Sequence, residues 1–271
     1  MAIKNPICFL LYVLIPSFAA FCLANNNDCP SISSKATYYK TPDGQGTPNG
    51  ACGLKEWGKS INDGKVAAVS SKLFKCGKGC GTCFEVKCKD KKWCSEKGTK
   101  LVVTDYGEGP ETDFIMSPKA FAEMAKDKES ENYLFKKSVV EVKYERVKCH
   151  YYNEGSDFVV KYDKKNSSWP DYISLIILYK GDEEYVEDVK IFVKDEKDKK
   201  VELVPMRRAY GAVWDIANHN IIPMVEIKTG KGVCFEWIEG VEPKTVECDI
   251  RSGHLKQPVN ISERSSASHS M

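Results

Sequence analysis

The sequence has almost no excess of charge of either sign, because its 271 residues include 40 lysines and arginines against 38 aspartates and glutamates. No basic block stands alone, so neither nucleic acid nor a strong general attraction to anionic membranes or acidic polymers is indicated. Histidine is scarce, and the four copies, at 150, 219, 254 and 269, show no metal-ligand spacing. Phosphate loops, dinucleotide fingerprints and serine-centred elbows are also missing. The sequence therefore predicts no metal and no cofactor.

A long apolar run is confined to the first 24 residues. Lys4 is the only charge there, the stretch from Ile7 to Ala24 is almost wholly apolar, and polar residues follow at once. This pattern predicts a secretory signal peptide over 1–24. The alternative is a membrane anchor, which Pro16 and the short positive flank disfavour. We therefore expect a secreted, extracellular protein with no membrane attachment after cleavage.

Ten cysteines remain in the mature chain, an even number that favours disulfides in an oxidising compartment. The run Cys76, Cys80 and Cys83 would also suit zinc or an iron–sulfur cluster, which is the weaker interpretation for a secreted chain. Two sequons, at Asn166 and Asn260, predict glycosylation.

The composition and the hydrophobic pattern of the sequence change near residue 150. Before it, glycine-rich loops alternate with strand-like runs at 84–86, 100–103 and 139–147, and only Ser117–Lys126 carries helix signals. After it come six short strand-like runs separated by turns, at 158–162, 173–179, 185–193, 200–204, 223–227 and 233–237. This spacing predicts an antiparallel β-sandwich, followed by a polar, flexible tail.

Several motifs resemble the expansin family in order and spacing. They are Thr37–Tyr39, Asn49–Gly53, Gly79–Cys88, Val103–Asp105 and Tyr210–Trp214. The extra early cysteine and the divergent acidic motif are most similar to the expansin-like B branch of plants. The resemblance implies a mainly β chain, with a six-stranded double-psi β-barrel followed by an immunoglobulin-like β-sandwich that binds polysaccharide. The expected domains are 25–152 and 156–248, with a flexible tail over 249–271.

The resemblance also implies the disulfides Cys52–Cys80, Cys83–Cys149 and Cys88–Cys94. Four cysteines are then left over, and the domain division suggests Cys29–Cys76 and Cys234–Cys248. Sequence alone could not choose among the possible connectivities.

Glycoside hydrolysis needs two carboxylates across the scissile bond. Asp105 matches the aspartate of the family's Thr-Asp motif, although an aspartate there could equally cap a turn. In the second motif, His-Phe-Asp-Leu-Ser, this chain has Asp113–Ser117, so Ile115 stands at the position of the catalytic acid. Asp113 could share the face of Ile115, but only a displaced backbone would bring its carboxyl to the same point. We therefore predict no catalytic residues.

A further acidic position of the related hydrolases also lacks a clear counterpart. Asn49 stands nearest, and the alignment of Asp43 in the same loop is uncertain. What remains is a polysaccharide-binding groove with hydroxyls and carboxylates that can bond to sugars. Its expected residues are Thr37, Tyr39, Asp105 and Asp113.

Exposed aromatic rings are expected to form a second binding surface, because flat sugar faces pack on aromatic faces. The resemblance implies a platform of Tyr172 and Tyr210, extended by Tyr38 from the first domain. The alternative is that Tyr172 and Tyr210 are ordinary half-buried strand residues. Trp214 is expected in the core, and Trp169 and Trp237 are ambiguous.

Together these features predict a monomeric, secreted cell-wall protein that binds cellulose, xyloglucan or other matrix glycans and loosens their contacts without hydrolysis. Two alternatives stay open. One is a glycan-binding protein without loosening activity, and the other is a weak endoglucanase.

Overall fold

The computed structural model describes residues 31–40, 49–109, 111–151, 156–168, 171–194, 200–217, 220–238, 247–249 and 254–256. The predicted signal peptide, Cys29, Asp43, Trp169 and Asn260 lie outside these ranges, as do the side chains of Trp237 and Cys248. Within them, no helix is both long enough and apolar enough to span a bilayer.

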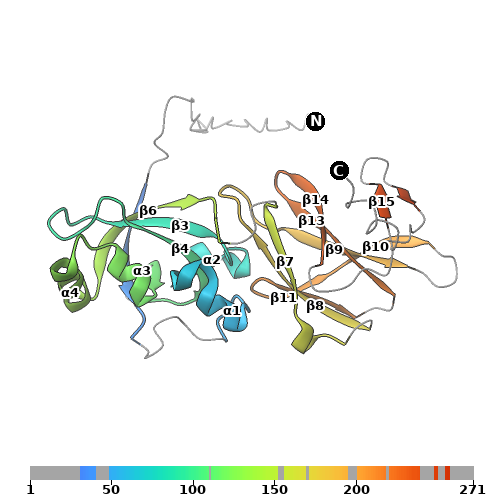
Figure 1. The fold of residues 1–271 in the computed structure, drawn as a ribbon, viewed down its shortest axis with the longest axis horizontal. Coiled ribbons are helices and arrows are strands. Elements are labelled where there is room, and N and C mark those ends of the chain that lie inside the picture. The colour runs from blue at the N-terminus through green and yellow to red at the C-terminus, as the bar shows by residue number, and fades with distance from the viewer. Residues whose placement is uncertain are drawn as a thin grey trace, which may run out of the picture.

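The first domain is a closed six-stranded β-barrel, as predicted (Figure 1). Its strands are β1 (Ile32–Tyr38), β2 (Val66–Val69), β3 (Cys83–Cys88), β4 (Thr99–Tyr106), β5 (Phe114–Met116) and β6 (Val140–Val147), in the order β1-β5-β2-β4-β3-β6. The interior is aromatic, because the rings of Phe84, Phe114 and Tyr144 pack edge to face at 5.0 to 5.7 Å. The alternation of buried and exposed residues at the start of β6 supplies Tyr144 to this core.

Four short α-helices surround the barrel: α1 (Lys55–Ser60), α2 (Ser71–Phe74), α3 (Pro118–Glu123) and α4 (Lys128–Lys137). The predicted helix corresponds to α3, which begins as expected, with Ser117 accepting a hydrogen bond from the backbone of Ala120. It ends sooner than expected, and α4 follows after a second cap, where Asp127 accepts from the backbone N–H of Ser130 at 2.8 Å. Two 3₁₀ turns, η1 (Ile61–Gly64) and η2 (Lys75–Gly77), complete this domain.

The second domain consists of two four-stranded antiparallel sheets, ordered β10-β9-β13-β14 and β11-β12-β8-β7. The strands are β7 (Phe158–Tyr162), β8 (Tyr172–Tyr179), β9 (Asp188–Lys194), β10 (Val201–Pro205), β11 (Arg207–Tyr210), β12 (Val213–Ala217), β13 (Ile221–Thr229) and β14 (Gly232–Trp237), with one 3₁₀ turn, η3 (Lys164–Asn166). Leu175, Trp214 and Val225 lie in the core of this domain, which confirms the expected burial of Trp214.

The two domains share a hydrophobic core. Ile176, Leu178 and Val213 belong to the sandwich but cluster with the buried residues of the barrel. Backbone hydrogen bonds cross the same boundary, from Cys149 N–H to Lys180 C=O at 2.7 Å and from Ala212 N–H to Cys52 C=O at 3.1 Å. One face of the sheet β11-β12-β8-β7 is therefore partly covered by the barrel.

The three disulfides implied by the resemblance are present: Cys52–Cys80, Cys83–Cys149 and Cys88–Cys94. Among the described cysteines, Cys76 and Cys234 form no disulfide and are exposed. Their expected partners, Cys29 and the side chain of Cys248, lie outside the described residues, so the Cys29–Cys76 and Cys234–Cys248 bridges stay predictions.

The predicted flexible tail contains regular structure where it begins. β15 (Glu247–Asp249) pairs antiparallel with β16 (His254–Lys256) as a separate two-stranded sheet. Four residues that include Ser252 and Gly253 separate the two strands in the sequence, a composition typical of a turn.

Candidate functional site

Four strands of the barrel place one residue each in a lateral row on its outer wall. Thr37 of β1 is opposite Ile115 of β5, Ile115 is opposite Ala68 of β2, and Ala68 is opposite Asp105 of β4. Because adjacent strands lie about 4.8 Å apart, Ile115 and Asp105 are separated by about 10 Å along the sheet. The structure therefore brings Thr37, Ile115 and Asp105 into one row.

The Asp105 carboxylate is anchored on one side and open on the other. Its Oδ1 accepts hydrogen bonds from the backbone N–H groups of Ala51 at 2.6 Å and Tyr106 at 2.8 Å. Its Oδ2 accepts none from the described residues, and the side chain is half-buried. Asp105 therefore combines the two roles considered for it, since one oxygen caps local backbone while the other can accept a bond from a ligand hydroxyl.

Ile115 lies in the middle of the row and leaves an apolar position there. Its neighbours Phe114 and Met116 are fully buried, whereas Ile115 is half-exposed on the opposite face of β5. A Cβ atom built on Gly107 would lie 3.0 Å from Ile115 Cδ1 and 3.2 Å from Ala68 Cβ, so the glycine lies close above this part of the row. The side chain at position 115 thus gives the row an apolar centre.

Asp113, two residues before Ile115, is held by two serine hydroxyls. Its Oδ1 accepts from the Ser70 hydroxyl at 2.7 Å and its Oδ2 accepts from the Ser34 hydroxyl at 2.8 Å. Both carboxylate oxygens are therefore used to join the start of β5 to β1 and to the residue that follows β2. The expected groove role of Asp113 is weakened by this arrangement, because its oxygens already have partners.

The two other expected groove residues are Thr37, the β1 member of the row, and Tyr39, which follows β1. The Thr37 hydroxyl donates to the backbone carbonyl of Ser138 at 2.9 Å, so its proton is used to hold the turn before β6. Tyr39 follows β1, is half-buried, and donates its backbone N–H to Met116 C=O at 2.9 Å. Asn49, the residue nearest to the third acidic position, is exposed.

A second surface lies on the uncovered part of the sheet β11-β12-β8-β7. The Tyr172 hydroxyl is 2.9 Å from Asp215 Oδ2, and Arg207 donates to both oxygens of Asp215 at 3.0 and 2.7 Å. The Arg207 guanidinium, followed by the Tyr172 bond, holds the pKa of Asp215 below its usual value. Burial and the bond to Asp215 raise the pKa of Tyr172. These contacts fix the Tyr172 ring in orientation.

Tyr210 is the exposed aromatic of this surface, with 49% of its area accessible. Its ring rests on the barrel, because a Cβ built on Gly53 would lie 2.8 Å from Tyr210 Cε2. Gly53 is two residues after Ala51, whose N–H binds Asp105. A single loop of the barrel therefore connects the Asp105 row to the Tyr210 surface.

Tyr38 does not extend this row of rings. It packs against Phe121 of α3 and Phe135 of α4 at centroid distances of 5.0 and 4.8 Å. Its hydroxyl donates to Phe135 C=O at 3.2 Å, and α4 lies at the end of the barrel away from the sandwich (Figure 1). Because its ring packs the two helices, the expected place of Tyr38 in the platform is weakened and stays a prediction.

Sequence reasoning missed several polar and aromatic neighbours of these surfaces. Arg207 was not singled out, although an arginine preceding the Tyr210–Trp214 motif was a possible signal. Lys161 lies over the Trp57 ring at 4.5 Å, and Tyr106 pairs with Phe74 at 5.3 Å. The described residues hold no group of three or more His, Cys, Asp or Glu side chains able to bind a metal.

Comparisons with known proteins agree with this architecture. The family model described as "Lytic transglycolase" matches residues 66–144, within the barrel. Expansin-like B1 of Arabidopsis thaliana is 39% identical over 213 residues, covering 78% of this chain and 80% of the relative. Expansin-B1 of Oryza sativa subsp. japonica is 34% identical over 189 residues, covering 68% of each.

The fold is also that of solved structures. The apo crystal structure of an expansin from Clavibacter michiganensis superposes with a TM-score of 0.56 at 18% identity, covering 84% of this chain and 96% of the other. A point mutant of a Clavibacter michiganensis expansin, in complex with cellohexaose, gives a TM-score of 0.55 at 18% identity, with coverage of 85% and 97%. With the fold thus supported and the plant relatives matched over most of their length, the chain belongs to the expansin family.

Proposed function

We propose that this protein is a secreted cell-wall protein that binds neutral wall polysaccharide and loosens its contacts without cutting it. The observation that carries the proposal is the continuity between the two surfaces, because the loop Ala51–Gly53 contacts both Asp105 and Tyr210. A glucan chain could therefore contact the open oxygen of Asp105 and the exposed ring of Tyr210 together. The cellohexaose complex of a related fold supports this ligand class.

The absence of hydrolysis follows from the Asp105 row. An inverting glycosidase needs an acid and a base about 6.5–9.5 Å apart, and a retaining enzyme needs them about 5–5.5 Å apart. Position 115 lies two strands from Asp105 in the row, and isoleucine has no proton to donate. Asp113, two residues before Ile115, is held by the hydroxyls of Ser34 and Ser70.

We expect purified protein to release no reducing sugar from cellulose, xylan or xyloglucan above the level of a buffer control. The Asp105→Asn variant serves as a matched control, because a contaminating hydrolase would be unaffected by it. Release of soluble sugar in proportion to the protein added, and its loss in Asp105→Asn, would show that the row is catalytic after all.

The aromatic surface gives a separate prediction. Tyr210→Ala and Tyr172→Ala should each weaken depletion onto insoluble cellulose several-fold, because a ring supplies about 1 kcal/mol or more of contact. Tyr172→Phe keeps the ring and removes only the bond to Asp215, so it should bind more tightly than Tyr172→Ala. A folded Tyr172→Ala/Tyr210→Ala double variant that binds as well as the wild type would contradict the platform.

Loosening is tested by extension of inactivated wall strips under constant load, run beside the sugar assay. Extension without sugar release supports the proposal. Binding without extension would favour the second candidate, a glycan-binding protein without loosening activity. The observation that favours this alternative is the divergence of the family's acidic motif at Asp113–Ser117. Asn166 is exposed on η3, and its glycosylation remains a prediction that mass spectrometry of the secreted protein can check.

A further inference from the structure

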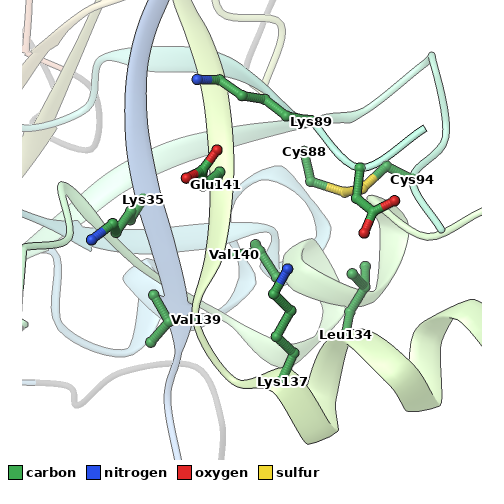
Figure 2. Close-up of a pocket in the computed structure, with 10 residues that line it drawn as sticks. Lys35, Cys88, Lys89, Cys94, Leu134, Lys137, Val139, Val140 and Glu141 are labelled. Atoms are coloured by element: carbon green, nitrogen blue, oxygen red, sulfur yellow. A yellow bond between two sulfur atoms is a disulfide. The ribbon is translucent and has the colours of Figure 1, made fainter. Parts of the chain in front are cut away.

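A hollow with lysines at its rim lies on the barrel wall, across β1 from the Asp105 row. It has two adjoining parts of about 530 and 370 Å³ that share Lys35, Lys89 and Glu141 (Figure 2). Volumes in this range are typical of ligand sites. The function proposed above does not use these residues.

The floor of the hollow is apolar and rigid. Leu134 of α4 and Val140 of β6 are buried beneath it, and the Cys88–Cys94 disulfide closes one side (Figure 2). A floor of this kind can carry the C–H face of a sugar ring. Binding specificity must then come from the polar groups at the rim.

The rim presents cations that have no internal partner. Among the described residues, neither Lys89 nor Lys137 forms an ion pair, whereas Lys35 is paired with Glu111. Both free lysines line the larger part of the hollow, Lys137 from the last turn of α4 and Lys89 from the segment that follows β3. An anionic ligand would satisfy both ammonium groups.

Carboxylates at the same rim narrow the class of anion. Asp90, Glu111 and Glu141 line the hollow beside the lysines, and Glu111 is already paired with Lys35. Glu141 is opposite Lys35 across the β1–β6 pair, and among the described residues it forms no ion pair of its own. The Glu141 carboxylate would repel a phosphate dianion, which has few hydrogen-bond donors to offset the repulsion. A uronic acid unit instead carries a single carboxylate for a lysine and several hydroxyls that can donate to Glu141.

We propose that this hollow binds an acidic polysaccharide built of uronic acid units. Lys89 and Lys137 hold carboxylates, Glu141 accepts hydrogen bonds from sugar hydroxyls, and the floor over Leu134 and Val140 carries the ring. The balanced net charge of the chain gives no indication of this site, because the three lysines come from distant parts of the sequence. The protein would then contact a neutral glycan through Tyr210 and an acidic one through this hollow.

The test is calorimetric titration of the secreted protein with a hexamer of galacturonic acid, beside cellohexaose and inorganic phosphate. In the Lys89→Ala/Lys137→Ala variant, affinity for the acidic hexamer should fall about tenfold or more, corresponding to the loss of two charge-assisted contacts. The matched control is Lys97→Ala/Lys136→Ala, which removes the same charge from exposed positions outside the hollow and should retain nearly full affinity. All four lysines are solvent-facing, so folding should be preserved.

The outcomes separate this inference from the proposed function. Depletion onto cellulose should be unchanged in the Lys89→Ala/Lys137→Ala variant, because Tyr172 and Tyr210 are intact. Equal losses in both double-lysine variants would show only general charge attraction and would overturn the site. So would tighter binding of phosphate than of the acidic hexamer, or no binding of the hexamer to the wild type.

Discussion

Replacing Cys83 and Cys149 together by alanine is expected to lower the free energy of unfolding of the barrel by about 4 kcal/mol. The bridge spans 66 residues and ties the first residue of β3 to the segment that follows β6. Cutting so long a loop gives the unfolded chain more freedom than cutting a short one. Both cysteines are also buried, so their removal leaves unfilled space in the core.

The Cys88–Cys94 bridge is the matched comparison for loop length, because it also joins two buried cysteines but closes a loop of only 6 residues. Its replacement by two alanines should cost about 2 kcal/mol by the same argument. Urea unfolding followed by tryptophan fluorescence measures both values. Equal losses in the two variants would mean that loop length does not govern the stability of this domain.

The strands of the second domain could be predicted well from the sequence, because their apolar runs are long and separated by turn residues. The run at 158–162 coincides with β7, and the runs at 173–179 and 233–237 begin within one residue of β8 and β14. β11 and β12 were missed. Both are short strands of the sheet β11-β12-β8-β7. The turn between them belongs to the Tyr210–Trp214 motif, which served only to identify the family resemblance.

Helices of the barrel were harder to predict. Most residues of α4 are polar, and Leu134 is the hydrophobic residue of this helix that is fully buried. Its start could have been found from Asp127, which caps the helix, followed by Glu129 and Glu131 in the first turn. α1 and α2 are only 6 and 4 residues long, and tertiary packing rather than helical periodicity defines them.

The site residues divide according to whether their role depends on one strand or on several. The position of Asp105 near the end of β4 could be predicted because it is local information, whereas its role in a groove stays a prediction. The capture of Asp113 by Ser34 and Ser70 could not be predicted, because these residues come from three distant segments that meet only in the closed barrel. The lysines of the hollow are a further case, since Lys89 and Lys137 are 48 positions apart in the chain.

The boundary between the domains offers the second large effect, through Gly211 in the turn between β11 and β12. Its φ of +49° favours glycine, and an added Cβ would lie 2.2 Å from the carbonyl oxygen of Ala51 and 2.6 Å from Cys52 Cα. Gly77 packs on the other side, since a Cβ added there would lie 2.7 Å from Gly211 Cα. Backbone therefore meets backbone here, and no side-chain rotation can relieve a clash.

Gly211→Ala is expected to destabilise the protein by about 3 kcal/mol, combining the strain of a left-handed residue with the forced separation of the two chain segments. Because Tyr210 is the adjacent residue and rests on Gly53, cellulose binding should fall as well. Thermal unfolding and limited proteolysis measure the loss of stability and of domain contact. Gly232→Ala is the control, since its φ is +147° but an added Cβ would meet nothing within 4 Å. If the two variants unfolded at the same temperature, the close approach at Gly211 would not be what holds the barrel against the sandwich.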